Sequence, residues 1–255
     1  MSRDIWDPQV YATYADERSR PFFDLVKRIA AVEPEYVVDA GCGSGELTRT
    51  LKDRWPDAAV HGFDSSPKMI DKTPVDVGLT FEVADATTWR PDRPVDVLVS
   101  NALLQWVPTH RELLATWVGL LAPNGRLAFQ VPGNFDAGSH RLIREMCQAG
   151  RWRSKLGDLP RERPVDDPVD YLDRLTGLGC RVDAWETTYV HLLQGEDAVL
   201  KWISGTALRP VFDRLTEAEA QEFTQELGEQ LNAVYPRKPY GTAFPFRRIF
   251  VVAEK

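Results

Sequence analysis

The segment at residues 37–45, VVDAGCGSG, combines one acidic residue with three glycines at alternate positions. β-branched residues precede the glycines and a helical pattern follows them, which predicts a strand, a tight turn and a helix. Glycine adopts positive φ and lets a ligand approach the backbone closely. Asp64 closes the next predicted strand, where a carboxylate can accept hydrogen bonds from both hydroxyls of a ribose. Together these features predict a nucleoside-binding site.

The type of nucleoside follows from the charges around the glycines. A dinucleotide fingerprint, G-x-G-x-x-G, starting at Gly41 would need glycine at position 46, where Glu46 stands. Its negative charge at a helix N-terminus would repel a pyrophosphate. Asp39 instead suits a cationic amino or sulfonium group, and S-adenosylmethionine carries a ribose, an amine and a positively charged sulfur. A Rossmann-type oxidoreductase and a non-catalytic nucleoside-binding protein are the alternatives from other functional classes.

The elements that must position this site alternate between β-branched runs and helical patterns, which is typical of a parallel sheet covered by helices. We expect strands at residues 36–40, 59–63, 79–83, 95–100 and 125–131. Two later runs, 180–192 and 246–253, predict an antiparallel hairpin at the sheet edge. The fold class is therefore α/β, Rossmann-like, with a mostly parallel seven-stranded sheet, an antiparallel edge strand and a helical cap.

We expect one domain over residues 1–255, divided into functional segments. These are an N-terminal helical lid (1–31), a cofactor-binding core (35–131), cap insertions (132–175 and 196–240) and C-terminal edge strands (180–192 and 246–253). Within the lid, Pro21 disfavours helical geometry at Arg20 and predicts two short helices with a break between them. Within the cap, residues 136–153 and 196–235 have helical patterns.

Composition excludes several classes of function. With 31 Lys and Arg against 38 Asp and Glu, the net charge is −7, which disfavours nucleic-acid binding. Three scattered cysteines give no disulfide framework and favour a reducing cytoplasm, and no apolar run is long enough to span a membrane. The four histidines lack metal-ligand spacing, so we expect no metal, and we expect His110 on a solvated loop. We also expect a monomer.

The segments DAGCGSG, FDSS, ADA and NALLQW, within residues 37–106, resemble the class I S-adenosylmethionine-dependent methyltransferases. At the ends of the third and fourth strands, Asp85 would accept the adenine amino group, Ala86 would offer a backbone amide, and Asn101 would lie beside the methyl group. Met69 would lie along the adenine face. The candidate cofactor contacts are Asp39, Gly41, Cys42, Gly43, Gly45, Asp64, Ser65, Met69, Asp85, Ala86 and Asn101.

A closer resemblance extends over nearly the whole chain. The segments WDPQVYATYADERSRP, SNALLQWVPTH, VPGNFDAGSH, ETTYVHLL and TALRP are similar to those of bacterial trans-aconitate 2-methyltransferases. This resemblance implies methyl transfer to one carboxylate of trans-aconitate in the cytoplasm, giving a monomethyl ester and S-adenosylhomocysteine. Another small carboxylic acid, a phenol or an amine is the alternative acceptor.

A small polycarboxylate bound by an acidic chain needs arginines, because a guanidinium pairs with a planar carboxylate through two hydrogen bonds. Aromatic rings over a sulfonium would add cation–π attraction, although Trp6 and Tyr14 also have the spacing of a helix packed on the core. No catalytic base is expected, because a carboxylic acid is already ionised at neutral pH. The candidate substrate contacts are Trp6, Tyr11, Tyr14, Arg18, Gln105, Trp106 and Arg209.

Overall fold

The computed structural model describes residues 15–30, 33–159 and 163–255, with the side chains of residues 15–18 left undescribed. The chain divides into two compact units. The first, called the sheet unit below, contains residues up to 132, 165–187 and 248–255; the second, called the cap unit, contains residues 133–164 and 188–247. The helix at residues 168–176 belongs to the sheet unit, whereas the sequence analysis assigns it to the cap.

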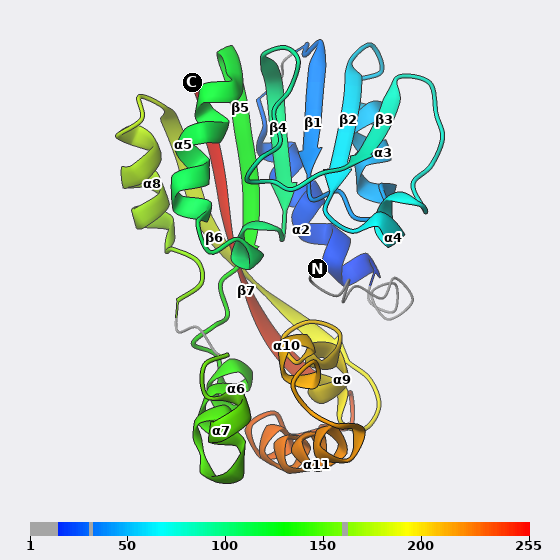
Figure 1. The fold of residues 1–255 in the computed structure, drawn as a ribbon, viewed down its shortest axis with the longest axis vertical. Helices are drawn as coiled ribbons and strands as arrows, with labels where there is room; N and C mark the ends of the chain where they lie inside the picture. The colour runs from blue at the N-terminus through cyan, green and yellow to red at the C-terminus, as the bar shows by residue number, and fades with distance from the viewer. Residues whose placement is uncertain (1–14, 31–32, 160–162) are drawn as a thin grey trace. The chain divides into compact units, whose positions relative to one another are not determined.

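Seven strands form one sheet (Figure 1). Their bounds are β1 Tyr36–Ala40, β2 Ala59–Asp64, β3 Leu79–Val83, β4 Val95–Asn101, β5 Leu121–Pro132, β6 Arg181–Leu193 and β7 Thr242–Glu254. The order is β3-β2-β1-β4-β5-β7-β6, with β1 to β5 parallel and β7 antiparallel to β5. The predicted fold class is confirmed, and the last strand lies between β5 and β6.

The central strands are buried on both faces, which explains their continuous apolar runs. All five residues of β1 are buried. In the sheet unit, α2 (Ala15–Arg28) and α3 (Glu46–Arg54) lie on one face, and α5 (His110–Leu120) and α8 (Pro168–Thr176) on the other (Figure 1). Two short elements, α4 (Pro67–Ile70) and η1 (Leu104–Trp106), follow β2 and β4. The carboxyl ends of the parallel strands therefore meet at one edge of the sheet.

The predicted break at Pro21 is wrong, because α2 is one helix from Ala15 to Arg28 with Pro21 inside it. Proline removes one backbone hydrogen bond from a helix and crowds the preceding turn. The same helix buries Phe22, Leu25 and Val26, and it packs against β5. Burial of that apolar face offsets the lost hydrogen bond, an effect that local propensity does not include.

The cap unit is helical, but its helices are shorter than the predicted segments. They are α6 (Gly138–Gln148), η2 (Gly150–Trp152), α7 (Arg153–Leu156), α9 (Ala198–Ser204), α10 (Arg209–Phe212) and α11 (Glu217–Val234). Gly150 begins η2 with φ 47°, two residues after the end of α6, and Thr216 caps the N-terminus of α11 with a capping box to Glu219. These local signals divide the two long helical patterns.

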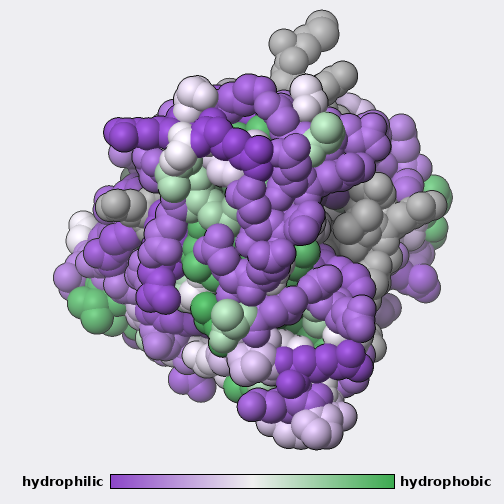
Figure 2. All heavy atoms as spheres, turned by 90° about the horizontal axis from the view of Figure 1, so that it is seen from below, coloured by the Kyte–Doolittle hydropathy of each residue, from purple (hydrophilic) through white to green (hydrophobic). Residues whose placement is uncertain are grey.

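The surface drawn in Figure 2 is mainly hydrophilic, with hydrophobic residues in small separate patches. Among the described residues, no helix is both long and apolar enough to cross a membrane.

Gly45 and Gly119 provide a matched test of the glycine turn. Gly45 has φ 77°, and a Cβ there would lie 2.6 Å from Phe81 Cζ, whereas a Cβ on Gly119 in α5 would meet no atom within 4 Å. We expect Gly45→Ala to lower the free energy of unfolding by about 1–3 kcal/mol, because alanine is strained in the left-handed region. Gly119→Ala should be neutral or stabilising by up to about 1 kcal/mol. Equal denaturation midpoints for both variants would contradict this account.

Candidate active site

The turn after β1 is built by backbone hydrogen bonds to the neighbouring strand. The amides of Gly41 and Cys42 both donate to the carbonyl oxygen of Phe63 in β2, at 2.8 and 3.0 Å. Gly41, Gly43 and Gly45 all have positive φ, as the sequence predicts. A Cβ on Gly41 would lie 3.0 Å from that of Leu103, while a Cβ on Gly43 would meet open space. The turn therefore leaves room over Gly43 for a ligand to approach the backbone.

Asp64, at the end of β2, has both carboxylate oxygens fixed by backbone amides. Oδ2 accepts from the amide of Gly43 at 3.0 Å, and Oδ1 accepts from the amide of Ser66 at 2.9 Å. Ser66 in turn caps the N-terminus of α4. Asp64 is thus oriented by the same loop that its carboxylate stabilises.

A pocket of about 210 Å³ lies at the carboxyl ends of the strands, within the sheet unit. Six of the predicted site residues line it: Gly41, Asp64, Ser65, Asp85, Ala86 and Trp106. Six further residues line it that the sequence analysis does not single out: Phe63, Ala84, Thr87, Leu103, Val107 and Pro108. All six are within two positions of a predicted residue along the chain. Extending each motif by its flanking residues would have found them.

Asp39 lies beneath the turn and is not among the residues that line the pocket. It is 2% exposed, and its Oδ2 accepts a hydrogen bond of 2.6 Å from Thr48 Oγ1 in α3. Burial raises the pKa of Asp39 to about 7, the hydrogen bond from Thr48 opposes this shift, and the charge of Asp64 adds to it. Asp39 is therefore poised to ionise when positive charge comes close.

Other predicted cofactor contacts have structural partners of their own. Cys42 Sγ lies 3.6 Å from the carbonyl oxygen of Gly43, and burial raises the pKa of this thiol, so it is protonated at neutral pH. Met69 is 6% exposed in α4 and does not line the pocket. Asp85 Oδ1 accepts from the amide and the hydroxyl of Thr87, at 2.8 and 2.5 Å, which fixes the turn after β3.

A buried network holds the pocket wall that follows β4. His110 is fully buried rather than on a solvated loop, because it begins α5 with its ring against α8. Its Nδ1 lies 3.2 Å from the carbonyl oxygen of Val107, and its Nε2 lies 3.1 Å from the hydroxyl of Tyr171. Burial and the charge of Arg111 lower the pKa of His110, which favours the neutral ring. Neutral His110 can donate to Val107 and accept from Tyr171, so it ties the pocket wall to α8.

The described residues include only part of the predicted set of substrate contacts. Trp6, Tyr11 and Tyr14 lie outside those residues, and Arg18 is in α2 with its side chain undescribed. Arg209 begins α10 in the cap unit, where its Nε donates to the carbonyl oxygen of Gly205 at 3.0 Å.

Gln105 and Asn101 lie in the sheet unit beyond and at the end of β4. Gln105 is buried and donates from Nε2 to the carbonyl oxygen of Ala102 at 2.5 Å. Its Oε1 is buried without a hydrogen-bond partner among the described residues. Asn101 is half-buried and accepts a hydrogen bond from Gln130 in β5.

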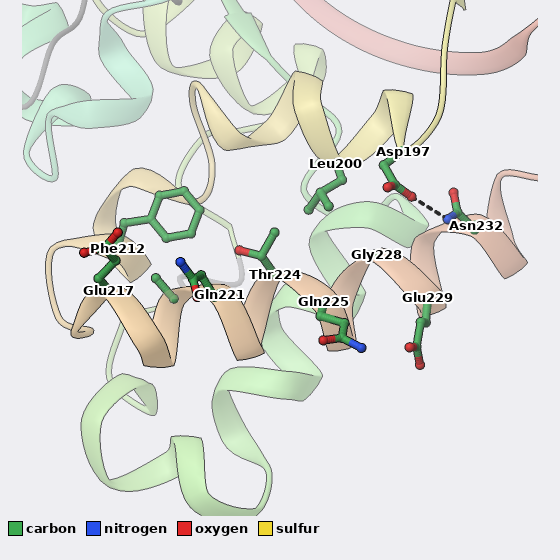
Figure 3. Close-up of a pocket in the computed structure, with 11 residues that line it drawn as sticks. Asp197, Leu200, Phe212, Glu217, Gln221, Thr224, Gln225, Gly228, Glu229 and Asn232 are labelled. Carbon is green, nitrogen blue, oxygen red and sulfur yellow. Dashed lines mark hydrogen bonds between the residues drawn. The ribbon is translucent and has the colours of Figure 1, made fainter.

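A second pocket, of about 590 Å³, lies in the cap unit along α11 (Figure 3). Leu200 and Phe212 point toward α11 from α9 and α10, and Asn232 donates to Asp197 Oδ1 at 2.7 Å. The charged groups that line it, Asp197, Glu217 and Glu229, are all acidic. Such a lining suits neither an anionic substrate nor a phosphate. In the described part of the chain, no group of three or more His, Cys, Asp or Glu is arranged to hold a metal ion.

Comparison with known proteins identifies the family. Residues 14–176 match the family model described as a methyltransferase domain. The chain is 50% identical over 260 residues to the trans-aconitate 2-methyltransferase of Streptomyces avermitilis, covering 98% of this chain and 97% of the relative. It is 52% identical over 252 residues to the protein of that name from Mycolicibacterium gilvum, covering 98% of each.

Solved structures with the same fold are more distant in sequence. A putative methyltransferase in complex with the Haloferax volcanii Trm112 activator has a TM-score of 0.57 and 18% identity, covering 100% of this chain and 97% of that one. Haemonchus contortus phosphoethanolamine N-methyltransferase 2, in complex with S-adenosyl-L-methionine, has a TM-score of 0.59 and 14% identity, covering 97% and 56%. With a glycine turn, a strand-end carboxylate and relatives at half identity over their full length, this chain belongs to the class I methyltransferases, in the family of the bacterial trans-aconitate 2-methyltransferases.

Proposed function

We propose that this protein transfers the methyl group of S-adenosylmethionine to one carboxylate of trans-aconitate, giving a monomethyl ester. The observation that carries the proposal is the identity of about half the residues, over 98% of the chain, with proteins named for that reaction. The geometry of the pocket supports the same cofactor, because its rim combines a glycine turn with an oriented carboxylate.

The described residues fit the nucleoside part of S-adenosylmethionine. A Cβ on Gly43 would meet no protein atom within 4 Å, so this turn has space beside its backbone. Asp64 would accept the ribose hydroxyls, and Asp85 and Ala86, which also line the pocket, would contact the adenine. Asp39, buried beneath the turn, would supply negative charge toward the amino and sulfonium groups. When bound, S-adenosylmethionine supplies an electrophilic methyl group on a positively charged sulfur.

The reaction is an in-line displacement. A carboxylate oxygen of the substrate attacks the methyl carbon, an oxygen–carbon bond forms, and the carbon–sulfur bond breaks with its electron pair on sulfur. No proton moves, because a carboxylic acid with a pKa near 4 is already ionised at neutral pH. The protein therefore needs no general base and acts by positioning. Alignment of two reactants can supply about 7–11 kcal/mol of the barrier.

Positioning requires positive charge, because the substrate is a polyanion and the chain has a net charge of −7. Arg18 and Arg209 remain our predicted clamps for the carboxylates that are not methylated. Trp6, Tyr11 and Tyr14 remain predicted to cover the methyl donor, and Gln105 and Trp106 to lie beside the acceptor.

We also expect the protein to act as a monomer in a reducing cytoplasm, without nucleic acid. The free thiols of Cys42, Cys147 and Cys180 are consistent with that compartment.

A turnover assay tests the proposal. The purified protein is incubated with methyl-labelled S-adenosylmethionine and a panel of trans-aconitate, other small carboxylic acids, a phenol and an amine. We expect a trans-aconitate monomethyl ester as the dominant product, identified by mass spectrometry, with S-adenosylhomocysteine formed in equal amount. Turnover of a phenol or an amine but of none of the acids would contradict the proposed acceptor, and cofactor binding without any turnover would indicate a nucleoside-binding protein.

Replacement of Asp64 tests ribose recognition. Asp64→Ala removes a carboxylate that would accept charge-assisted hydrogen bonds, and we expect the Kd for S-adenosylhomocysteine to rise by more than about tenfold. Asp53→Ala, which removes a carboxylate from an exposed position in α3, is the control and should leave that Kd unchanged. Equal dissociation constants for the two variants would exclude Asp64 from the site.

The raised pKa of Asp39 predicts a pH dependence of cofactor binding. With a pKa of about 7, this carboxyl is largely protonated at pH 6 and largely ionised at pH 8. A cationic ligand binds the ionised form better, so we expect affinity for S-adenosylmethionine to rise by up to about tenfold from pH 6 to pH 8. Calorimetry on Asp39→Asn should show a flatter profile. The same profile in wild type and variant would assign the pH dependence to another group.

A further inference from the structure

Three polar side chains from three adjacent strands form a row at the carboxyl edge of the sheet. Asn101 ends β4, Gln130 lies opposite it in β5, and Arg248 in β7 lies opposite Pro132. Gln130 is 1% exposed and Arg248 is 6% exposed. Gln130 Nε2 donates to Asn101 Oδ1 at 2.6 Å, and Arg248 Nη1 donates to Gln130 Oε1 at 3.4 Å. All three residues belong to the sheet unit.

The row lies on the face of the sheet that α2 covers. Successive side chains of a strand point to opposite faces. Phe129, directly before Gln130, packs edge-on against Tyr171 of α8, with 5.1 Å between ring centroids. Gln130 therefore points away from α8, toward the face where α2 packs against β5. Leu103, two residues after Asn101 at the end of β4, lines the pocket of about 210 Å³ described above.

The guanidinium of Arg248 fixes the orientation of both amides. A guanidinium can only donate hydrogen bonds, so the oxygen of Gln130 must face it and the nitrogen of Gln130 must face Asn101. A nitrogen that donates to Asn101 requires an oxygen in return, so Asn101 turns its Oδ1 toward Gln130. The Nδ2 group of Asn101 then points out of the row with two hydrogens. Among the described residues, this nitrogen has no hydrogen-bond acceptor.

We propose that Asn101 contacts the carboxylate that is methylated, donating from Nδ2, and that Gln130 and Arg248 are positioning residues that hold this donor outward. This inference rests on the proposed function, since it needs a carboxylate acceptor. A neutral donor suits the attacking group, because the carboxylate loses its charge as the ester forms. A cation in direct contact with it would stabilise the ground state more than the transition state. In the row, Gln130 and Asn101 lie between the guanidinium of Arg248 and the proposed substrate carboxylate. Arg248 therefore acts on the substrate only by orienting these two amides.

Gln130→Glu tests this inference, because it changes which groups of the row donate and accept hydrogen bonds while the side chain keeps its size. In Gln130→Glu the carboxylate pairs with Arg248, and its second oxygen can only accept, so Asn101 must turn its nitrogen inward and its oxygen outward. We expect kcat/KM for trans-aconitate to fall by about 10- to 100-fold. The Kd for S-adenosylhomocysteine and the unfolding temperature should stay close to their wild-type values, because the pocket residues are unchanged and the new carboxylate is paired with Arg248.

Three further variants complete the test. Asn101→Ala should lose a similar factor in kcat/KM with unchanged Kd for S-adenosylhomocysteine. Arg248→Lys keeps a cation that can only donate and should retain most of the activity, whereas Arg248→Gln, which offers both oxygen and nitrogen, should lose it. Arg126→Lys is the matched control, since Arg126 is also buried between β5 and β7 but lies at the opposite edge, 3.3 Å from Glu254. Arg126→Lys should change the free energy of unfolding and leave kcat/KM for trans-aconitate at its wild-type value.

The outcomes separate this inference from the proposed function. If the wild type methylates trans-aconitate and Gln130→Glu does so with the same kcat/KM, the orientation row is wrong and the proposed function stands. Asn101→Ala that weakens S-adenosylhomocysteine binding and leaves KM for trans-aconitate unchanged would also overturn the inference, because Asn101 would then contact the cofactor. A wild type that methylates no carboxylic acid would contradict the proposed function itself.

Discussion

The hydrogen bond from the Gly43 amide to the Asp64 carboxylate joins the ends of two parallel strands and defines the site. It requires the turn after β1 to project its amides toward β2, and that geometry requires glycine at positions with positive φ. We propose that this carboxylate, once held, binds a diol, and its charge would repel a phosphate. The absence of glycine at position 46, where Glu46 begins α3, works in the same direction. This backbone-to-side-chain contact therefore orients the carboxylate that we propose to contact the ribose.

Two buried ionisable side chains of opposite type, Asp39 and Arg248, lie in the sheet unit. Asp39 carries negative potential beneath the glycine turn, at the end of β1. Arg248 in β7 carries positive charge opposite Pro132, at the carboxyl end of β5. Both are buried, so each acts through a medium in which charge is weakly screened. Asp39, when ionised, and Arg248 thus place charges of opposite sign within the sheet unit, although the chain as a whole is acidic.

The parts of the fold that local chemistry determines could be predicted from the sequence. The five parallel strands follow from short apolar or β-branched runs, of which those of β1 and β4 are buried. The glycine turn follows from the conformations that only glycine adopts readily. The continuous helix through Pro21 could not be predicted, because its stability comes from packing Phe22 and Leu25 in the core. His110 was similarly misplaced, since its burial depends on contact with Tyr171 far along the chain.

The residues of the candidate site likewise divide into those that a local sequence motif predicts and those that depend on long-range contacts. Asp64, Asp85 and Trp106 could be found because each follows the end of a predicted strand. The row from Asn101 to Arg248 could not, because it depends on which strand lies beside β5 and in what register. A sequence pattern predicts a late antiparallel strand but not that Arg248 pairs opposite Pro132. Long-range register, rather than local motif, thus places the positive charge.

The central claim is that the turn and its carboxylate select an adenosyl ligand with a cationic amino-acid tail over one with a pyrophosphate. Calorimetric titration of the purified protein with S-adenosylhomocysteine and, separately, with NAD⁺ and NADH tests it most directly. The account predicts saturable binding of S-adenosylhomocysteine and no detectable heat from either dinucleotide. Tight binding of NAD⁺ or NADH, with no heat from S-adenosylhomocysteine, would contradict it.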